Sequence, residues 1–301
     1  MRTLRDYRAT TLAGAFALAA TSYAIYGYYD VLSRRYVKAS LSDWQTMMVG
    51  AVSYAFNLNI GSIVGGAGFR LRLYSRLGLE QRTIAAMIAF SIATNWIGYL
   101  LVAGVVFAVG GVQFPEGWKA GDGAMRAIGA LMALTSLGYI VLCRFSPRRE
   151  LSFRGRSFVL PSASMALRQV VVGAANWLVI AGVVFVLLSH SVSFATALAV
   201  VCVASIAGAL AHIPGGLGVI EGVFVAMLGW TMGTGAILAG VLAYRAVYYL
   251  VPLIVAAVLF VALEWLARRG DARAATRSPG TALARGQRLR PAAPDHRETD
   301  A

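Results

Sequence analysis

Charged residues are scarce in this sequence. They make up 13% of the 301 residues, while 58% are hydrophobic. Ordinary soluble domains carry about 25% charged residues. A chain with half that share cannot cover a globular surface with polar groups, so the composition excludes an ordinary soluble enzyme. It predicts an integral membrane protein, whose apolar surface faces lipid.

Acidic residues are scarcer than basic ones. There are 13 Asp and Glu against 27 Lys and Arg, which gives a formal net charge of +14. An excess of this size is typical of proteins that bind nucleic acid or an anionic membrane surface. Here the basic residues flank apolar runs instead of forming one basic domain, as the positive-inside rule requires. We therefore predict no nucleic-acid partner.

Residues that carry catalytic chemistry are also few. Cys143 and Cys202 stand far apart, without the spacing of a metal site or a disulfide framework, and they are expected to be inert thiols in packed helices. The chain has three histidines and none of the motifs GxxxxGK, HExxH or GxSxG. We predict that it is not an enzyme and that it uses no metal and no cofactor.

Long apolar runs dominate what is present. A spanning helix needs about 20 mainly apolar residues. Eight runs are candidates: 11–29, 44–66, 83–109, 124–143, 170–188, 194–211, 219–230 and 236–265. The predicted fold is an all-α, polytopic membrane protein with about eight transmembrane helices, in one domain over residues 1–266. Residues 267–301 lose the apolar period and are predicted to form a disordered basic tail.

Basic loops predict the orientation. With eight spans, the loops after the second and fourth helices share one side with both termini. That side is predicted to be cytoplasmic, in a bacterial inner membrane. One loop disagrees, because Arg34, Arg35 and Lys38 would lie on the opposite side.

Two segments interrupt the helical pattern at membrane depth. Residues 57–68 and 211–221 each contain Gly-Gly-x-Gly. Irregular backbone is not tolerated in contact with lipid, so both breaks must face protein or a wet cavity. Paired breaks in the two halves of a transporter indicate its binding site. Close helix packing through small residues is an equal explanation.

Charged side chains accompany the second break. Glu221 is the single carboxylate well inside the apolar stretch 194–265, and a charge at depth usually faces a cavity or a partner. It also follows a Pro-Gly-Gly break, where helix N–H groups favour an anion. Helix capping at the interface is the alternative. His212 is a candidate partner of Glu221 or of a phosphate, although a lone histidine is more often structural. Arg245 is deep and is expected to face inward.

Arg70 and Arg72 follow the first break. Arginine binds phosphate with a planar fork, which makes both residues candidate phosphate ligands. Arginines that extend to the interface and set the topology are the simpler explanation. The two residues lie on different helix faces and need not share a role.

Several motifs together resemble one known family. They are Gly27-Tyr28-Tyr29-Asp30, Arg35-Tyr36-Val37, Asn57-x-Asn59-x-Gly61, Arg70-x-Arg72-Leu73-Tyr74-Ser75-x-x-Gly78-Leu79, His212-x-Pro214-Gly215-Gly216-Leu217-Gly218-Val219-x-Glu221 and Tyr244-Arg245-x-x-Tyr248-Tyr249-x-x-Pro252. In this order they resemble the membrane domain of the lysylphosphatidylglycerol synthase/flippase family. That family includes the multiple peptide resistance factor and YbhN-type inner membrane proteins without a synthase domain. The match covers about Thr21 to Leu263.

The resemblance implies a protein that moves phospholipid, notably aminoacylated phosphatidylglycerol, across the inner membrane. In the family, importance attaches to the positions of Asp30, Arg70, Arg72 and Glu221. The lysyltransferase domain of the fused members has no counterpart here, so lysyl transfer is not expected.

We therefore expect a protein that binds and translocates phospholipid of the anionic or aminoacylated phosphatidylglycerol class. The predicted binding residues are Asp30, Asn57, Asn59, Arg70, Arg72, Tyr74, His212, Pro214, Gly215, Gly216, Gly218, Glu221 and Arg245. A membrane scaffold or regulator, a small-solute transporter and an intramembrane lipid enzyme are the alternatives. The sequence leaves open whether the chain forms a homo-oligomer.

Overall fold

The computed structural model describes residues 7–110, 122–147, 150–153, 156–189, 191–262 and 265. The chain divides into two compact units, residues 1–256 and residues 257–301. The first unit contains nearly all of the described structure. The predicted basic tail, 267–301, lies outside the described residues, so the domain boundary at residue 266 stays a prediction.

Among the described residues, six helices are long and apolar enough to cross a membrane. They are α1 (Ala9–Val37), α4 (Gln81–Ala108), α5 (Asp122–Phe145), α6 (Ala163–Leu187), α7 (Phe194–Ala211) and a last helix that runs from α9 (Thr234–Tyr244) through the π-helical turn η4 (Arg245–Leu250) to Ala262. A short antiparallel hairpin, β1 (Glu150–Phe153) and β2 (Arg156–Val159), connects α5 to α6. The prediction of an all-α, polytopic membrane protein is confirmed.

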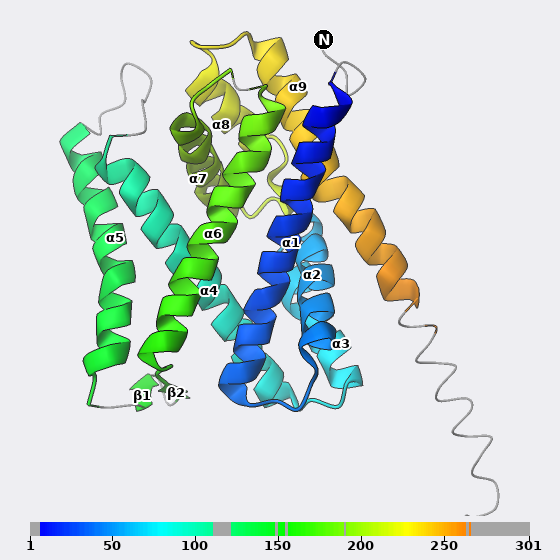
Figure 1. Ribbon diagram of the computed structural model, residues 1–301, viewed down its shortest axis with the longest axis vertical. Helices are drawn as coiled ribbons and strands as arrows, with labels where there is room; N and C mark the ends of the chain where they lie inside the picture. Colours follow the sequence, from blue (N-terminus) through cyan, green and yellow to red (C-terminus); the bar gives the residue numbers. More distant parts are fainter. Residues whose placement is uncertain are drawn as a thin grey trace, which may run out of the picture. The chain divides into compact units, whose positions relative to one another are not determined.

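The first Gly-rich break turns the chain back on itself. The segments α2 (Asp43–Ile60), η2 (Ser62–Gly68) and α3 (Phe69–Arg76) form a helical hairpin, which we call hairpin one. The Tyr74 hydroxyl near the end of α3 donates to the carbonyl of Thr46 near the start of α2 at 3.3 Å. Hairpin one therefore begins and ends at the same end of the first unit (Figure 1). The expectation that residues 44–66 form a complete span is wrong.

The second break does the same from the opposite end. We call α7, the 3-10 turn η3 (Pro214–Gly216) and α8 (Val219–Leu228) hairpin two. The ten residues of α8 are about 15 Å long, half of a hydrocarbon core of about 30 Å. The expected seventh span, 219–230, is therefore one arm of a re-entrant hairpin. Both predicted Gly-rich broken segments are confirmed.

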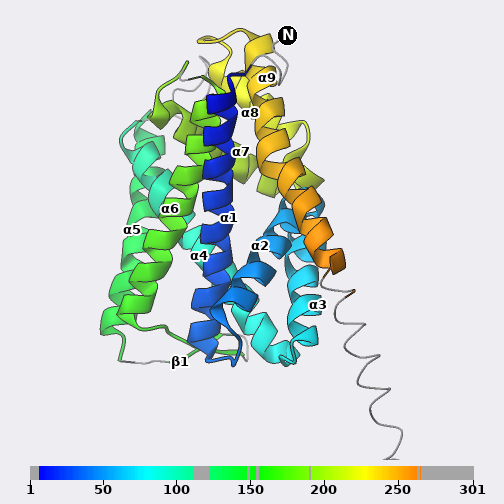
Figure 2. The same cartoon turned by 45° about the vertical axis from the view of Figure 1, so that its right-hand side comes forward.

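The two halves of the chain form an inverted repeat. In the first half, α1 and α4 come before and after hairpin one. In the second half, α6 and α9 come before and after hairpin two, and all of these elements point in the opposite direction (Figures 1 and 2). Each first arm has 18 residues and follows a serine N-cap, Ser42 or Ser193. The tips share the pattern Ile-x-Gly-Gly-x-Gly, at residues 63–68 and 213–218. Helix α5 comes between the two halves in the sequence. It adds one crossing, which returns the chain to the opposite end of the first unit.

The direction of the first and last helices differs from the expected topology. Tyr7 lines a pocket with Met232, whereas Ser22 contacts Tyr248, so α1 and α9 run parallel. The end of the first unit at which α1 begins is called here the N-terminal end. The expected eight-span arrangement gives the first and last helices opposite directions, so it does not fit these two described helices.

The opposite end of the first unit collects the basic loops and is called here the basic end. It carries Arg34, Arg35, Lys38, Arg76, Arg82 and Arg144, at the ends of α1, α3 and α5 and the start of α4. Because hairpin one leaves and returns at this end, the loop at residues 34–38 no longer conflicts with the loop at residues 76–82. Counting residues 44–66 as a complete span caused that conflict.

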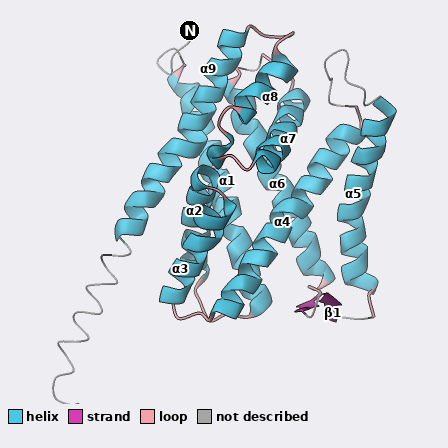
Figure 3. Cartoon of the chain, turned by 180° about the vertical axis from the view of Figure 1, so that it is seen from behind, coloured by secondary structure: helices cyan, strands magenta, loops and turns pink. Residues whose placement is uncertain are grey.

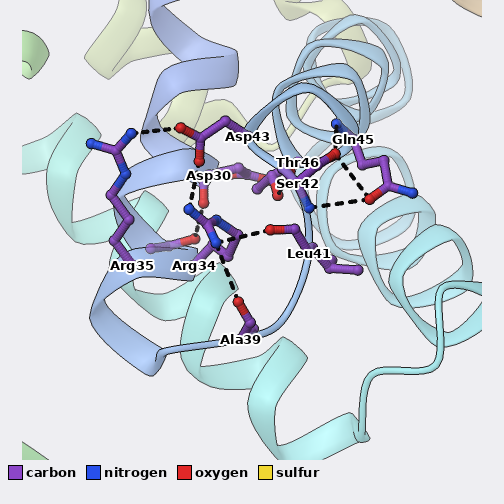
Figure 4. Close-up of polar contacts among 10 residues, drawn as sticks. Asp30, Arg34, Arg35, Ala39, Leu41, Ser42, Asp43, Gln45 and Thr46 are labelled. Atoms are coloured by element: carbon purple, nitrogen blue, oxygen red, sulfur yellow. Dashed lines mark hydrogen bonds and ion pairs between the residues drawn. The ribbon is translucent and has the colours of Figure 1, made fainter.

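Local chemistry explains where hairpin one begins. Ser42 caps α2: its hydroxyl accepts the backbone N–H of Gln45, whose side chain accepts the N–H of Ser42. Asp43, the first residue of α2, pairs with Arg34 and Arg35 at the end of α1 (Figure 4). These contacts fix the turn between α1 and hairpin one.

Glycine allows the helices to touch. A methyl group added at Gly98 of α4 would lie 2.2 Å from the carbonyl carbon of Gly173 of α6. One added at Gly104 of α4 would lie 2.5 Å from the backbone nitrogen of Ala133 of α5. Backbone therefore packs on backbone along α4, which runs obliquely from the end of α3 toward α5 (Figure 3). Both cysteines are buried, as expected.

Candidate functional site

The tips of the two hairpins meet inside the first unit. A methyl group added at Gly215, in hairpin two, would lie 3.7 Å from the carbonyl oxygen of Leu58 in hairpin one. The Asn59 side chain donates to the carbonyls of Ala55 at 2.8 Å and of Tyr249, in η4, at 3.3 Å. Two broken helices and a π-helical turn therefore share one place, which both hairpins reach from opposite ends.

Glycine is required at both tips, for different reasons. In hairpin one, a methyl group at Gly65 would lie 2.2 Å from the carbonyl oxygen of Phe56, so the returning backbone touches α2. In hairpin two, Gly215, Gly216 and Gly218 have φ of 64°, 58° and 80°, in the left-handed region that glycine adopts without strain.

An ion pair ties hairpin two to the last helix. The Arg245 side chain donates from Nε and Nη2 to the Glu221 carboxylate. Its Nη1 donates to the carbonyl of Gly215 at 2.8 Å and its Nη2 to that of Gly216 at 3.1 Å. Glu221 also accepts the N–H of Gly218 at 2.8 Å. Both predictions, a capping carboxylate and a charged group beside the break, are therefore realised in Glu221.

A second ion pair holds hairpin one. Arg70 donates to Asp30 of α1 from Nε at 2.9 Å and from Nη2 at 3.1 Å. The same carboxylate accepts the hydroxyls of Tyr74 at 2.9 Å and of Ser91 at 2.7 Å. Arg70 also donates to the carbonyl of Gly66 at 3.4 Å. This carboxylate has four donors, so it needs no ligand to be satisfied.

The two pairs differ in exposure. The side chains of Asp30 and Arg70 are 1% and 4% exposed, whereas those of Glu221 and Arg245 are 22% and 10% exposed. A group that approaches hairpin two can reach Glu221, but Asp30 is enclosed. The arrangement favours the second pair as the site that exchanges its partners.

Tyrosine rings connect the two pairs. The guanidinium of Arg70 lies 5.5 Å from the ring centroid of Tyr26, and that of Arg245 lies 5.5 Å from the ring of Tyr249. Between them the rings follow in the order Tyr26, Tyr54, Tyr248 and Tyr249, with centroids 3.7, 6.4 and 5.9 Å apart. A continuous aromatic layer therefore separates the two ion pairs.

Sequence reasoning missed several buried polar residues of this region. Ser22 of α1 donates to Asn176 of α6 at 2.7 Å and contacts the Tyr248 hydroxyl. Ser91 of α4 completes the shell of Asp30. Ser22, Ser91 and Asn176 each interrupt an otherwise apolar run. The rule that polar groups at membrane depth need partners, applied above only to Glu221 and Arg245, would have found them.

Other predicted residues lie apart from the two ion pairs. Arg72 is exposed on another face of α3 than buried Arg70, as the alternation of faces predicted. The His212 ring lies 2.8 Å from the carbonyl of Leu210, so its recorded partner is its own helix end and not Glu221. Asn57 packs against Gly66, and exposed Pro214 begins η3.

Comparison with known proteins finds relatives that match most of the chain. No family model matches. The chain is 41% identical over 269 residues to the Inner membrane protein YbhN of Escherichia coli (strain K12), covering 89% of the chain and 85% of that protein. It is 33% identical over 269 residues to the Uncharacterized protein slr0712 of Synechocystis, covering 88% and 83%. A Phosphatidylglycerol lysyltransferase of Staphylococcus haemolyticus is 25% identical over 264 residues, which are 82% of the chain and 29% of that protein.

Proposed function

Because the chain belongs to the family of the inner membrane protein YbhN, we propose that it binds phospholipid and moves it across a bacterial inner membrane. The observation that carries this proposal is the partly exposed Glu221–Arg245 pair at the meeting point of two broken helices. Charges and unwound backbone at depth are costly unless they serve a ligand.

The surroundings favour a lipid over a small solute. Large apolar side chains next to both tips are exposed: Ile63 and Val64 in hairpin one, Leu210 and Leu217 in hairpin two. A phospholipid needs both kinds of surface, since its headgroup requires charged partners and its acyl chains require apolar ones. The lysyltransferase relative is named for phosphatidylglycerol, which supports an anionic or aminoacylated headgroup of that class.

For the arginines we propose roles that differ from those predicted. Asp30 already occupies Arg70, and Arg72 lies on another face of α3. Arg245 is instead the proposed ligand of the lipid phosphate, with a planar fork suited to it. Glu221 is the proposed partner of a cationic headgroup. Asp30 and Arg70 hold hairpin one in place.

The basic end is proposed to face the cytoplasm, following the positive-inside rule. The N-terminal end, where hairpin two opens, then faces the periplasm. Each re-entrant hairpin thus reaches the proposed site from a different aqueous side, which suits a substrate that starts at one surface and ends at the other.

Reconstituted liposomes test the proposal. Fluorescent phosphatidylglycerol that reaches the outer leaflet is bleached by an external reductant, and the bleached fraction over time gives the transbilayer rate. We expect Glu221→Gln to lower the rate at least tenfold, because it loses the charge while it keeps the acceptor for the Gly218 N–H. Glu80→Gln, an exposed carboxylate at the start of α4, is the matched control. Equal rates in wild type and Glu221→Gln would contradict the proposal.

A further inference from the structure

The two hairpins are held by different means. Backbone contact anchors hairpin one to α1: a methyl group at Gly27 would lie 2.7 Å from the Met47 carbonyl oxygen, and one at Gly50 would lie 3.0 Å from the Gly27 Cα. The buried Asp30–Arg70 pair adds a second tie. Packing and an enclosed ion pair therefore fix hairpin one together.

The tip of hairpin two leaves room around several of its glycines. A methyl group at Gly215 would meet no described atom closer than 3.7 Å, and at Gly218 or Gly222 none of the described atoms within 4 Å. The Arg245 side chain of η4 crosses to this tip and donates to two tip carbonyls and to Glu221. One guanidinium therefore ties the last helix to this tip.

We infer that Arg245 is a ligand-released latch: a phosphate diester that binds its guanidinium frees the tip of hairpin two, while hairpin one stays closed. This inference rests on the proposed function, because it concerns the same site. A phosphate oxygen is a charged acceptor and forms a stronger bond with guanidinium than a neutral carbonyl does. The Gly215 and Gly216 carbonyls are thus the contacts that a phosphate displaces.

The consequence is confined to hairpin two. Carbonyls that lose their donor inside apolar surroundings are unfavourable, so the tip is driven toward water at the N-terminal end. At hairpin one, the Asp30 carboxylate accepts four hydrogen bonds, two of them from Arg70. A phosphate therefore does not displace Asp30 from Arg70. Lysine cannot replace Arg245, because a single ammonium does not present the planar fork that reaches two carbonyls and a carboxylate together.

Amide hydrogen exchange of the full chain in dodecyl maltoside, a detergent without phosphate, tests the latch. The compared peptides cover residues 205–222 and 53–70. Phosphatidylglycerol should accelerate exchange in the first peptide by about tenfold, the effect of losing hydrogen bonds to a charged group, and leave the second unchanged. Diacylglycerol, which has acyl chains but no phosphate, should change neither peptide. If inorganic phosphate alone accelerates exchange in 205–222, the latch stands, but its ligand is a phosphate in solution and not a lipid.

Two variants complete the test. Arg245→Lys should show fast exchange in 205–222 without lipid and no further response to phosphatidylglycerol. Arg82→Gln, which removes an exposed charge at the start of α4, should respond as wild type does. If Arg245→Lys does not fold, the wild-type comparison alone still decides. Exchange in 205–222 that phosphatidylglycerol slows or leaves unchanged, or an equal acceleration in 53–70, overturns the latch. A lipid response of the wild type without transbilayer movement overturns the proposed function and keeps the latch.

Discussion

Hairpin one and hairpin two are copies in length, capping and tip pattern, yet their ion pairs have different surroundings. In hairpin one, the arginine lies on the returning arm and its carboxylate is on α1. Both are buried, and two hydroxyls donate to the carboxylate. In hairpin two, the carboxylate lies on the returning arm, its arginine is on the last helix, and both remain partly exposed. The comparison teaches that one repeated unit can enclose its ion pair in one half of the chain and leave it accessible in the other.

The largest expected effect on stability comes from removing each arginine in turn. Arg70→Ala leaves Asp30 buried without its ion partner, and breaking a buried pair costs about 3–5 kcal/mol. Arg245→Ala leaves a carboxylate that water can reach, and should cost about 1–3 kcal/mol. Thermal unfolding in detergent measures both. Replacing Asp30 and Arg70 together by Leu and Met should recover part of the loss. An equal loss for the two single variants would remove the distinction between the hairpins.

Glycine replacement probes the tips themselves. Gly65→Ala forces a methyl group against the Phe56 carbonyl and should cost about 1–3 kcal/mol through backbone displacement. Gly215→Ala has room for the methyl group, and its cost of about 1–2 kcal/mol comes from the left-handed backbone alone. Unfolding midpoints of the two variants rank them. A lower midpoint for Gly215→Ala than for Gly65→Ala would show that hairpin two is the tighter one.

Asn59 joins hairpin one to the last helix, which carries Arg245, because its side chain donates to the Tyr249 carbonyl. Asn59→Ala should cost about 1 kcal/mol, the net value of a hydrogen bond. Thr135→Ala, whose hydroxyl bonds within exposed α5, is the matched control and should cost less. Unfolding midpoints again provide the measurement. If both variants unfold at the same temperature, Asn59 does not couple hairpin one to the last helix.

The smallest effect concerns the base of hairpin one. Hydrogen bonding from Arg35, with the charges of Arg35 and Arg34, lowers the pKa of Asp43. A carboxylate whose pKa is lower in the folded state stabilises above its unfolded value of about 3.9, and this contribution is lost as the pH falls through the lowered folded pKa. Asp43→Asn should therefore lower the unfolding midpoint slightly at pH 7 and by less at pH 3. A difference that is the same at both pH values would contradict this origin.

Composition and apolar runs were enough to predict the membrane fold, and the Gly-Gly-x-Gly pattern located both breaks. The sequence could not show that residues 44–66 turn back, because a hairpin of two half-length helices has almost the same apolar length as one spanning helix. The pairing of Arg70 with Asp30 was equally hidden, since 40 residues separate them and motif order says nothing about contact. Glu221 was found because its carboxylate stands out in an apolar run. Ser91 and Asn176 are smaller signals of the same kind.

Helix α5 has a consequence for how such a protein can arise. The first repeat begins and ends at the N-terminal end, so a second copy joined directly to it would point the same way. One additional crossing returns the chain to the basic end, and the second copy therefore starts upside down (Figure 1). A single peripheral helix thus converts a tandem duplication into a two-fold related pair, whose halves meet tip to tip.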